Sequence, residues 1–254
     1  MRLERLEDRN LPAGMVTVGV DSQTGVLTIT GDNQANEIVI HQVASPVPPG
    51  MFIPTMLGYR IRGIDTKVRE INDDSGFGVA AQRSPARSAV TIWWGTEIHI
   101  NLAGGQDSLR IYNTSLAGPL TIDMGWGSDT LRMKNVHVLS TQASKSAASA
   151  PLNVNLGDGA DRTILDNVTS ATDLNIDAGA GRDRCTVRQV AAGTTGSGGA
   201  LAVEMGSGKH DFLRIVQAIA DNALLSDTSG AGGILLHSAD NFGSESDTGF
   251  QTVR

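Results

Sequence analysis

The segment LTIDMGWGSDTLRM, from Leu120 to Met133, decides the fold, because related segments return along the chain. Two close copies are LNVNLGDGADRTIL, from Leu152 to Leu165, and LNIDAGAGRDRCTV, from Leu174 to Val187. Weaker copies are IHINLAGGQDSLRI, from Ile98 to Ile111, and LAVEMGSGKHDFLRI, from Leu201 to Ile215. Each copy is an alternating apolar segment, a turn related to G-x-G-x-D, and a second alternating segment. The chain is therefore built from a repeated unit.

The repeat has a regular length, which the last residue of each turn measures. These residues are Asp107, Asp129, Asp161, Asp183 and Asp211. They are separated by 22, 32, 22 and 28 residues. A unit of about 22 residues with occasional insertions is typical of a stacked solenoid. The spacing predicts an all-β fold, a β-solenoid with windings of about 22 residues.

The alternation predicts which side chains are buried. Leu120, Ile122 and Met124 share one face before the turn, and Leu131 and Met133 share one after it. We expect the equivalent positions of the other copies to point inward too: Leu152, Val154, Leu156, Thr163, Leu165, Cys185, Val187, Leu213 and Ile215. The intervening positions are mostly polar. A period of two with polar residues outside is typical of half-buried strands, and a helix would need a different spacing.

An amide side chain follows the second strand of every copy. The residues are Asn113, Asn135, Asn167, Gln189 and Gln217. Stacked windings would bring these amides about 4.8 Å apart, where each could hydrogen-bond to the next. The alternative is that each amide only closes a local turn. The pattern resembles right-handed parallel β-helices, a family with asparagine ladders at one corner, and this resemblance implies that fold.

Composition agrees with a strand-rich repeat and excludes several classes of protein. Of 254 residues, 30 are glycine and only 4% are aromatic, which suits tight turns. The formal net charge of −7 opposes binding to a nucleic-acid backbone, so we expect no nucleic-acid partner. Cys185 is the single cysteine, which excludes an intrachain disulfide, and we expect it to be a buried core residue. No apolar run is long enough to span a membrane.

Three regions are expected along the chain. Residues 1–14 form a charged leader, and residues 15–97 form an irregular, strand-rich N-terminal part that covers one end of the solenoid. Residues 98–254 hold the regular windings and a C-terminal cap. Two insertions, at 141–150 and 191–200, are small and polar and should leave the solenoid at one edge.

The leader carries a family resemblance. LERLEDRNLPA, from Leu3 to Ala13, resembles the L-E-x-L-E-D-R segment near the N-terminus of many large planctomycete-type extracytoplasmic proteins. In that family such a segment is commonly followed by glycine–aspartate repeats, and GVLTITGDNQANEIVI, from Gly25 to Ile40, resembles its first repeat. The resemblance implies an exported or cell-surface protein and no particular reaction.

The turn aspartates also suggest a metal. The G-x-G-x-D turn resembles the calcium-binding repeat of RTX-type β-rolls, in which turn carbonyls and stacked carboxylates bind Ca²⁺ between windings. This resemblance implies Ca²⁺ ligation by Asp107, Asp129, Asp161, Asp183 and Asp211. Two features depart from the RTX pattern. The first glycine of the repeat is replaced, and the turns recur only once in each winding of about 22 residues, a longer spacing than that of RTX turns. The alternative is that the aspartates close their turns by accepting backbone N–H groups.

Enzyme motifs are absent from the sequence, and no catalytic residue is predicted. GDGAD is followed by strand-like sequence, which excludes a dinucleotide-binding turn. The outward column Asp123, Asn155, Asp177 and Glu204 is interrupted by an amide, whereas a polysaccharide lyase or glycosidase on this fold would use clustered acids. Trp126 in an exposed turn, near carboxylates, suits stacking on a sugar.

The sequence thus favours a non-enzymatic, exported or cell-surface module with a structural or adhesive role, stabilised by Ca²⁺ if the turns bind it. Its expected partners are cell-surface components or polysaccharide. The alternatives are a β-helical enzyme acting on polysaccharide and a carbohydrate-binding module.

Overall fold

The computed structural model describes residues 14–44, 57–72, 88–92, 97–140, 150–194, 198–228, 233–238 and 240–253. These residues form strands and turns and contain no helix, so the chain is all-β as predicted. Leu3–Ala13, Trp93, Trp94 and most of the insertion at 141–150 lie outside the described residues, as do 195–197 in the second insertion.

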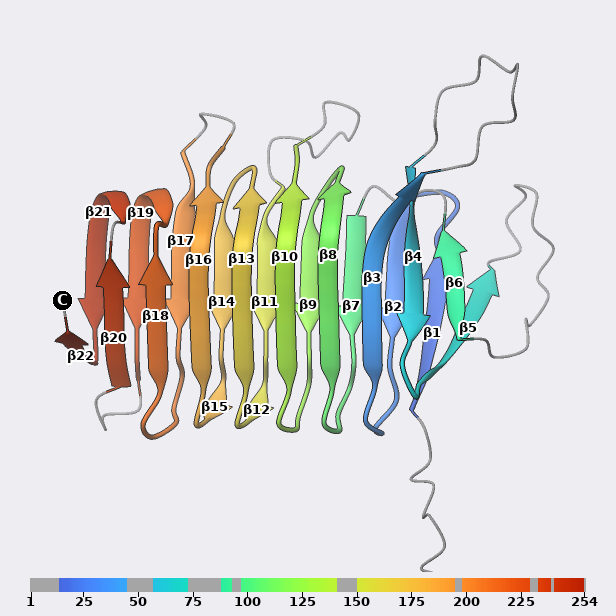
Figure 1. Ribbon diagram of the computed structural model, residues 1–254, viewed down its shortest axis with the longest axis horizontal. Helices are drawn as coiled ribbons and strands as arrows, with labels where there is room; N and C mark the ends of the chain where they lie inside the picture. Colours follow the sequence, from blue (N-terminus) through green and yellow to red (C-terminus); the bar gives the residue numbers. More distant parts are fainter. Residues whose placement is uncertain are drawn as a thin grey trace, which may run out of the picture.

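Two layers of strands run along the long axis of the molecule (Figure 1). The first layer comprises β2 (Val26–Thr30), β7 (Glu97–Asn101), β9 (Leu120–Asp123), β11 (Leu152–Asn155), β14 (Leu174–Asp177), β17 (Ala200–Glu204), β19 (Ile219–Ser226) and β21 (Asn241–Thr248). The second layer comprises β3 (Glu37–Ala44), β8 (Ser108–Leu116), β10 (Thr130–Val138), β13 (Arg162–Ser170), β16 (Arg184–Ala192), β18 (Phe212–Val216), β20 (Gly233–Ser238) and β22 (Phe250–Val253). Within each layer, neighbouring strands come from successive repeats.

The strands of successive repeats pair in parallel and in register. Leu131 of β10 pairs with Leu109 of β8 on one side and with Thr163 of β13 on the other. The second of these pairs spans a longer stretch of chain than the first, yet the register is the same. The extra residues of the longer span fall between β10 and β11, where the sequence predicts an insertion. A second insertion separates β16 from β17 in the same way.

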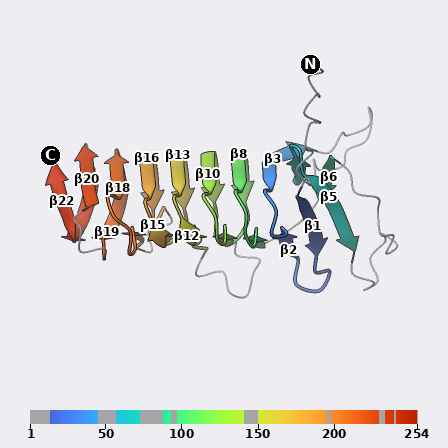
Figure 2. The same cartoon turned by 90° about the horizontal axis from the view of Figure 1, so that it is seen from below.

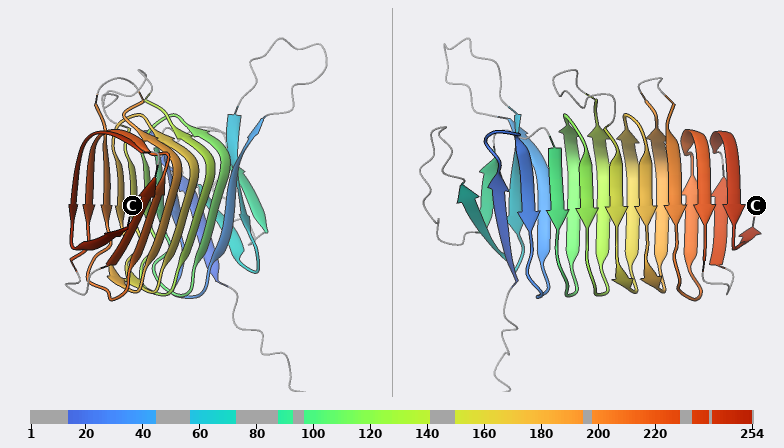
Figure 3. Two further views of the ribbon diagram at one scale, coloured as in Figure 1. Left: turned by 60° about the vertical axis from the view of Figure 1, so that its left-hand side comes forward. Right: turned by 180° about the vertical axis from the view of Figure 1, so that it is seen from behind.

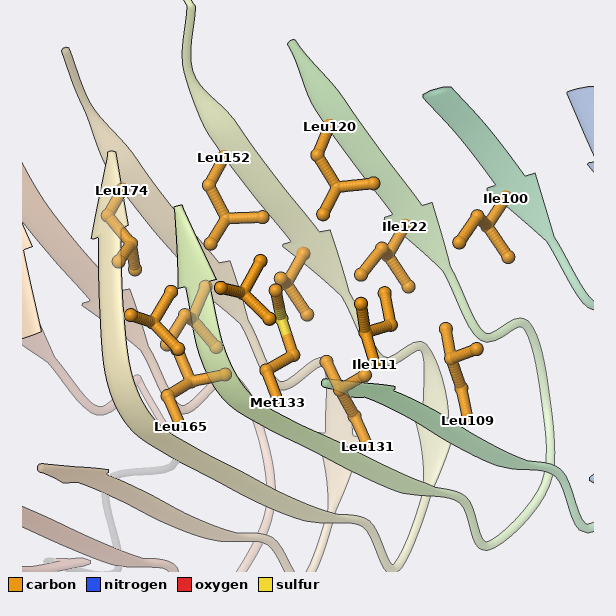
Figure 4. Close-up of a cluster of buried hydrophobic side chains, with 14 of the residues drawn as sticks. Ile100, Leu109, Ile111, Leu120, Ile122, Leu131, Met133, Leu152, Leu165 and Leu174 are labelled. Atoms are coloured by element: carbon orange, nitrogen blue, oxygen red, sulfur yellow. The ribbon is translucent and has the colours of Figure 1, made fainter. Parts of the chain in front are cut away.

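The apolar core lies between the two layers (Figure 4). Leu120, Ile122 and Met124 are at most 1% exposed, and Leu131 and Met133 are fully buried. The equivalent residues of the other copies are buried as well, from Leu152 to Ile215. Cys185 is among them, and burial raises the pKa of its thiol to about 12, as does the neighbouring Asp183. The predicted inward positions, including the unreactive cysteine, are therefore confirmed.

The turns also stack, and glycine is needed where they touch. A Cβ at Gly127 would lie 1.4 Å from the carbonyl oxygen of Gly105, one winding away. The same clash, again 1.4 Å, would occur between Gly159 and the oxygen of Gly127. Figure 2 shows these turns from below, with the two short strands β12 (Asp158–Gly159) and β15 (Ala180–Gly181) paired between neighbouring turns. No other residue type would permit so close an approach of the backbones.

The N-terminal part mixes parallel and antiparallel pairing. It holds β1 (Met15–Val20), β4 (Leu57–Gly63), β5 (Lys67–Asn72) and β6 (Ala89–Ile92). The antiparallel pairs are β1 with β2, β3 with β4, and β4 with β6. β2 and β3 nevertheless pair in parallel with β7 and β8, so the repeating register begins at Val26, before Ile98 where the first clear copy of the repeat starts.

The same register continues to the C-terminal end of the described chain. β20 pairs in parallel with β18, β22 with β20, and β21 with β19. Figure 3 shows the successive windings nested behind one another in one view and side by side in the other. The last three strands, β20 to β22, lie in the part expected to hold the C-terminal cap and continue the same pairing.

Candidate functional site

The five turn aspartates form one buried column along the molecule. Each is at most 2% exposed, although each lies in a turn. The backbone N–H of Asp107 donates to Oδ1 of Asp129 at 2.7 Å, and Asp129 donates in the same way to Asp161 at 2.7 Å. Asp161 donates to Asp183, and Asp183 to Asp211, both at 2.8 Å. The structure thus brings all five predicted residues together and links each winding to the next.

The column ends differently at its two ends. At the N-terminal end stands Asn36, whose backbone N–H donates to Oδ1 of Asp107 at 2.6 Å and whose side-chain amide donates to the same oxygen at 3.1 Å. At the other end Gly233 occupies the next register position, because Phe212 pairs with Ile234. The Oδ2 atom of Asp227, six residues earlier in the chain, accepts the Gly233 N–H at 2.5 Å.

Burial changes the ionisation of the aspartate column. Burial raises the pKa of Asp107 and of Asp161 to about 7, against the lowering effect of the accepted N–H groups. Burial likewise raises the pKa of Asp129 and of Asp183 to about 6, and it raises that of Asp211. The second carboxyl oxygen, Oδ2, of all five is buried without a hydrogen-bond partner. A negative charge on these groups is therefore unfavourable in the fold.

The hydrogen bonds of the turns determine which oxygen atoms are free to bind Ca²⁺. Ca²⁺ takes six to eight oxygen ligands, which RTX-like turns would draw from carbonyls and carboxylates. Here the Oδ1 atoms accept backbone N–H groups, and the carbonyls of Gly125 and Gly157 accept from Asp158 and Ala180 at 3.2 and 3.1 Å. Among the described residues, no three His, Cys, Asp or Glu side chains are grouped to hold a metal ion. The geometry favours hydrogen bonding between neighbouring windings by aspartate, whereas the predicted alternative was closure of each residue's own turn, and calcium binding stays a prediction.

The corner amides share one backbone conformation and hydrogen-bond in part as a ladder. Asn113, Asn135, Asn167, Gln189 and Gln217 all have positive φ, between 50° and 58°. The side-chain amide of Asn135 donates to Asn113 at 2.9 Å, and that of Asn167 donates to Asn135 at 3.0 Å. Both predicted roles therefore hold at once: the residues turn the chain, and the asparagines bond from winding to winding.

Trp126 is the exposed aromatic residue of this edge, with 58% of its surface exposed. A Cβ on Gly104 would lie 2.3 Å from the indole, so the ring lies against the backbone of the preceding turn. Trp126 also forms backbone bridges to Gly104 and Asp158. The indole is thus part of the stacked turns as well as exposed, and sugar binding by Trp126 stays a prediction.

The outer surface of the first layer holds a groove of about 410 Å³ along several strands. Asp123, Asn155, Asp177 and Glu204 line it in register, as the sequence indicates. Oδ1 of Asp123 accepts the N–H of Gly125 at 3.2 Å, and Oδ1 of Asp177 accepts that of Gly179 at 2.9 Å. These two carboxylates therefore help to start their own turns. Two of the acids in the groove thus have a structural role.

Comparison with known proteins returned no match: no family model, no curated protein and no solved structure is similar to this chain. No helix in the described part of the chain is long and apolar enough to cross a membrane.

Asn36 is the member of the column that the repeated sequence pattern does not indicate. Its turn, GDNQAN from Gly31 to Asn36, lacks the G-x-G spacing and ends in an amide. The available indication was its position, since Asn36 directly precedes the alternating strand EIVI as each aspartate precedes its own strand. Asp227 was missed because it directly follows a strand, whereas the other aspartates directly precede one.

Proposed function

We propose that the chain is a right-handed parallel β-helix that serves as a non-enzymatic, structural or adhesive module of an exported or cell-surface protein. The observation that carries this proposal is the buried aspartate column from Asn36 to Asp211. Its groups are turned inward and hydrogen-bonded between windings, so they stabilise a stack and offer nothing to a substrate. The in-register parallel pairing supports the β-helix, and the L-E-x-L-E-D-R resemblance supports export.

A stacked architecture suits such a role because each winding contacts only its neighbours, and the outer faces form long, regular surfaces. The buried aspartates of the turns are used to hold the stack together. In the groove of the first layer, Asp123 and Asp177 are engaged with their own turns. An enzyme acting on polysaccharide would need its carboxyl groups free for the sugar.

Three measurements test the proposal. Protease treatment of intact source cells should remove the protein, and protection until lysis would contradict surface exposure.

A reducing-end assay on acidic polysaccharides should show no release of new ends, and release that is lost on Asp177→Asn and Glu204→Gln substitution would establish an enzyme instead. A calcium titration followed by thermal melting tests whether Ca²⁺ stabilises the fold. An unchanged Tm at millimolar Ca²⁺ would contradict stabilisation by calcium.

A further inference from the structure

The outer surface of the second layer is strongly basic, although the chain as a whole is acidic. Each strand of this layer from β8 to β18 presents at least one exposed cation, at positions that alternate with buried core residues. The cations, which we call the basic face, are Arg110, Arg132, Lys134, Arg162, Arg184, Arg188 and Arg214. Seven of the 20 basic residues of a chain with net charge −7 thus lie on one face.

Neighbouring strands place several of these cations side by side. Arg132 pairs directly with Arg110, and Arg162 directly with Arg184. Strands lie about 4.8 Å apart, and like charges at that separation repel by roughly 1 kcal/mol even in water. Side-by-side cations on a sheet are therefore destabilising, and an anion bound across two windings would relieve the repulsion.

The chain itself neutralises only part of this charge. Arg110 pairs with Glu37 at 3.1 Å, and Arg188 pairs with Asp166 at 3.6 Å. The guanidinium of Arg184 lies over the ring of Phe212, 5.9 Å from its centre. Within the part of the chain that the structure describes, no ion pair is formed by Arg132, Lys134, Arg162 or Arg214. Arg132, Arg162 and Arg214 also have no acid beside them in the strand register, whereas Lys134 lies beside Asp166.

A groove of about 420 Å³ lies on the basic face where β8 and β10 bend at the amide corner. Its walls include Arg110, Arg132 and Lys134 together with Tyr112, Asn113 and Asn135. Guanidinium groups bind carboxylates through paired hydrogen bonds, amides bind hydroxyl groups, and an aromatic ring packs against a sugar. Tyr112 is held in place by stacking on His41, with ring centres 5.5 Å apart.

We propose that the basic face binds a linear acidic polysaccharide whose carboxylates lie across successive windings, with the groove at Arg132 and Lys134 as its strongest subsite. This inference rests on the proposed adhesive function and names its ligand. The combination of arginine, amide and one aromatic side chain matches a uronic acid unit, which carries both carboxylate and hydroxyl groups.

Single-stranded nucleic acid fits the face less well. Proteins that bind it stack successive bases on several aromatic side chains. On the described basic face the outward aromatic residues are Tyr112 and Phe212, and Phe212 lies under Arg184.

The test is binding to polygalacturonate, measured by calorimetry on the full chain at low and at physiological salt. The wild type should bind, and the double variant Arg132→Gln/Lys134→Gln should lose about tenfold or more in affinity because two charge-assisted contacts are removed. The matched control, Arg182→Gln/Lys209→Gln, removes the same charge from exposed turn positions and should stay within about twofold. Unchanged circular dichroism and Tm show that each variant is folded.

Four outcomes would overturn the proposal: no binding of polygalacturonate by the wild type, equal losses in the two double variants, equal binding of the fully methyl-esterified polymer, or tighter binding of oligodeoxythymidine. None of these outcomes depends on where the protein resides. If the protein binds polygalacturonate but is protected from protease on intact cells, only the cell-surface role is contradicted. If protease removes the protein from intact cells but it does not bind polygalacturonate, only the proposed ligand is contradicted.

Discussion

At the scale of single residues, the aspartate column shows how one side chain can serve two purposes in a repeat. Each carboxyl group ends its own turn and accepts the backbone N–H of the preceding winding. The cost is a buried acidic group whose Oδ2 has no partner. Burial therefore raises the pKa of these groups, from 3.8 to about 7 for Asp161.

This shift predicts an unusual dependence of stability on pH. A carboxyl group whose pKa is raised on folding stabilises the fold below its unfolded pKa, near 4, and loses that contribution as pH rises through the folded value. For the column, the loss falls between pH 4 and about 7. We expect the Tm to fall as the pH is raised across this window, measured by thermal melting at constant ionic strength. A Tm that rises steadily from pH 4.5 to 7 would contradict the assignment.

Substitution of Asp161 separates its charge from its hydrogen bond. Asp161→Asn keeps an oxygen acceptor for Asp129 but cannot ionise, so it should be more stable than the wild type at pH 8 and show a weaker pH dependence. Asp161→Ala removes the acceptor and should cost about 1–3 kcal/mol at pH 5. Urea unfolding at both pH values checks this. Equal effects of the two substitutions would mean that the hydrogen bond is unimportant.

The corner amides make a second prediction at this scale. Asn135 combines a φ of 53° with ladder bonds to Asn113 and Asn167. Asn135→Gly keeps the conformation and loses the ladder, whereas Asn135→Ala loses both, so the alanine variant should be less stable than glycine by about 1 kcal/mol. Chemical denaturation gives both values. An alanine variant as stable as the glycine variant would show that the left-handed conformation costs nothing here.

At the scale of strands and turns, glycine allows the turns to approach as closely as the paired strands do. Ser207 and Gly208 are neighbours in one turn and differ sharply: Ser207 is exposed, whereas a Cβ on Gly208 would lie 1.4 Å from the oxygen of Gly181. Gly208→Ala should therefore destabilise the chain by more than about 2 kcal/mol, while Ser207→Ala should stay within about 0.5 kcal/mol. Equal unfolding midpoints for the two variants would contradict the close stacking of the turns.

Much of the strand arrangement was predictable from the sequence, for a physical reason. Side chains such as Leu120 and Ile122 alternate because a strand has a period of two, and the repeat fixes which strands are equivalent. Asn36 was missed because its turn joins the same hydrogen-bonded column without the glycines of the repeat. The sequence could not decide between calcium ligation and hydrogen bonding by Oδ1, because the spacing of aspartates is the same whether the carboxylates face a cation or a backbone N–H.

At the scale of the whole molecule, net charge conceals an uneven distribution. The sum of −7 gives no sign of the basic face. That face becomes visible only when the parallel register places Arg110 beside Arg132 and Arg162 beside Arg184, each pair drawn from two successive repeats. A regular stack turns a scattered set of arginines into a continuous surface.

The central claim is that successive windings lie side by side along one axis, and spin-label distances test it most directly. Thr28, Asn153, Asn175, Ala202 and Leu224 occupy equivalent positions on the first layer. With one label at position 28 and the other moved outward from 153 to 224, each winding should add about 4.8 Å, whatever the length of chain between the labelled positions. The buried Cys185 should stay unlabelled, which the wild type controls. A distance from position 28 that stops growing, or shrinks again by position 224, would mean that the sheet closes on itself and would contradict the account.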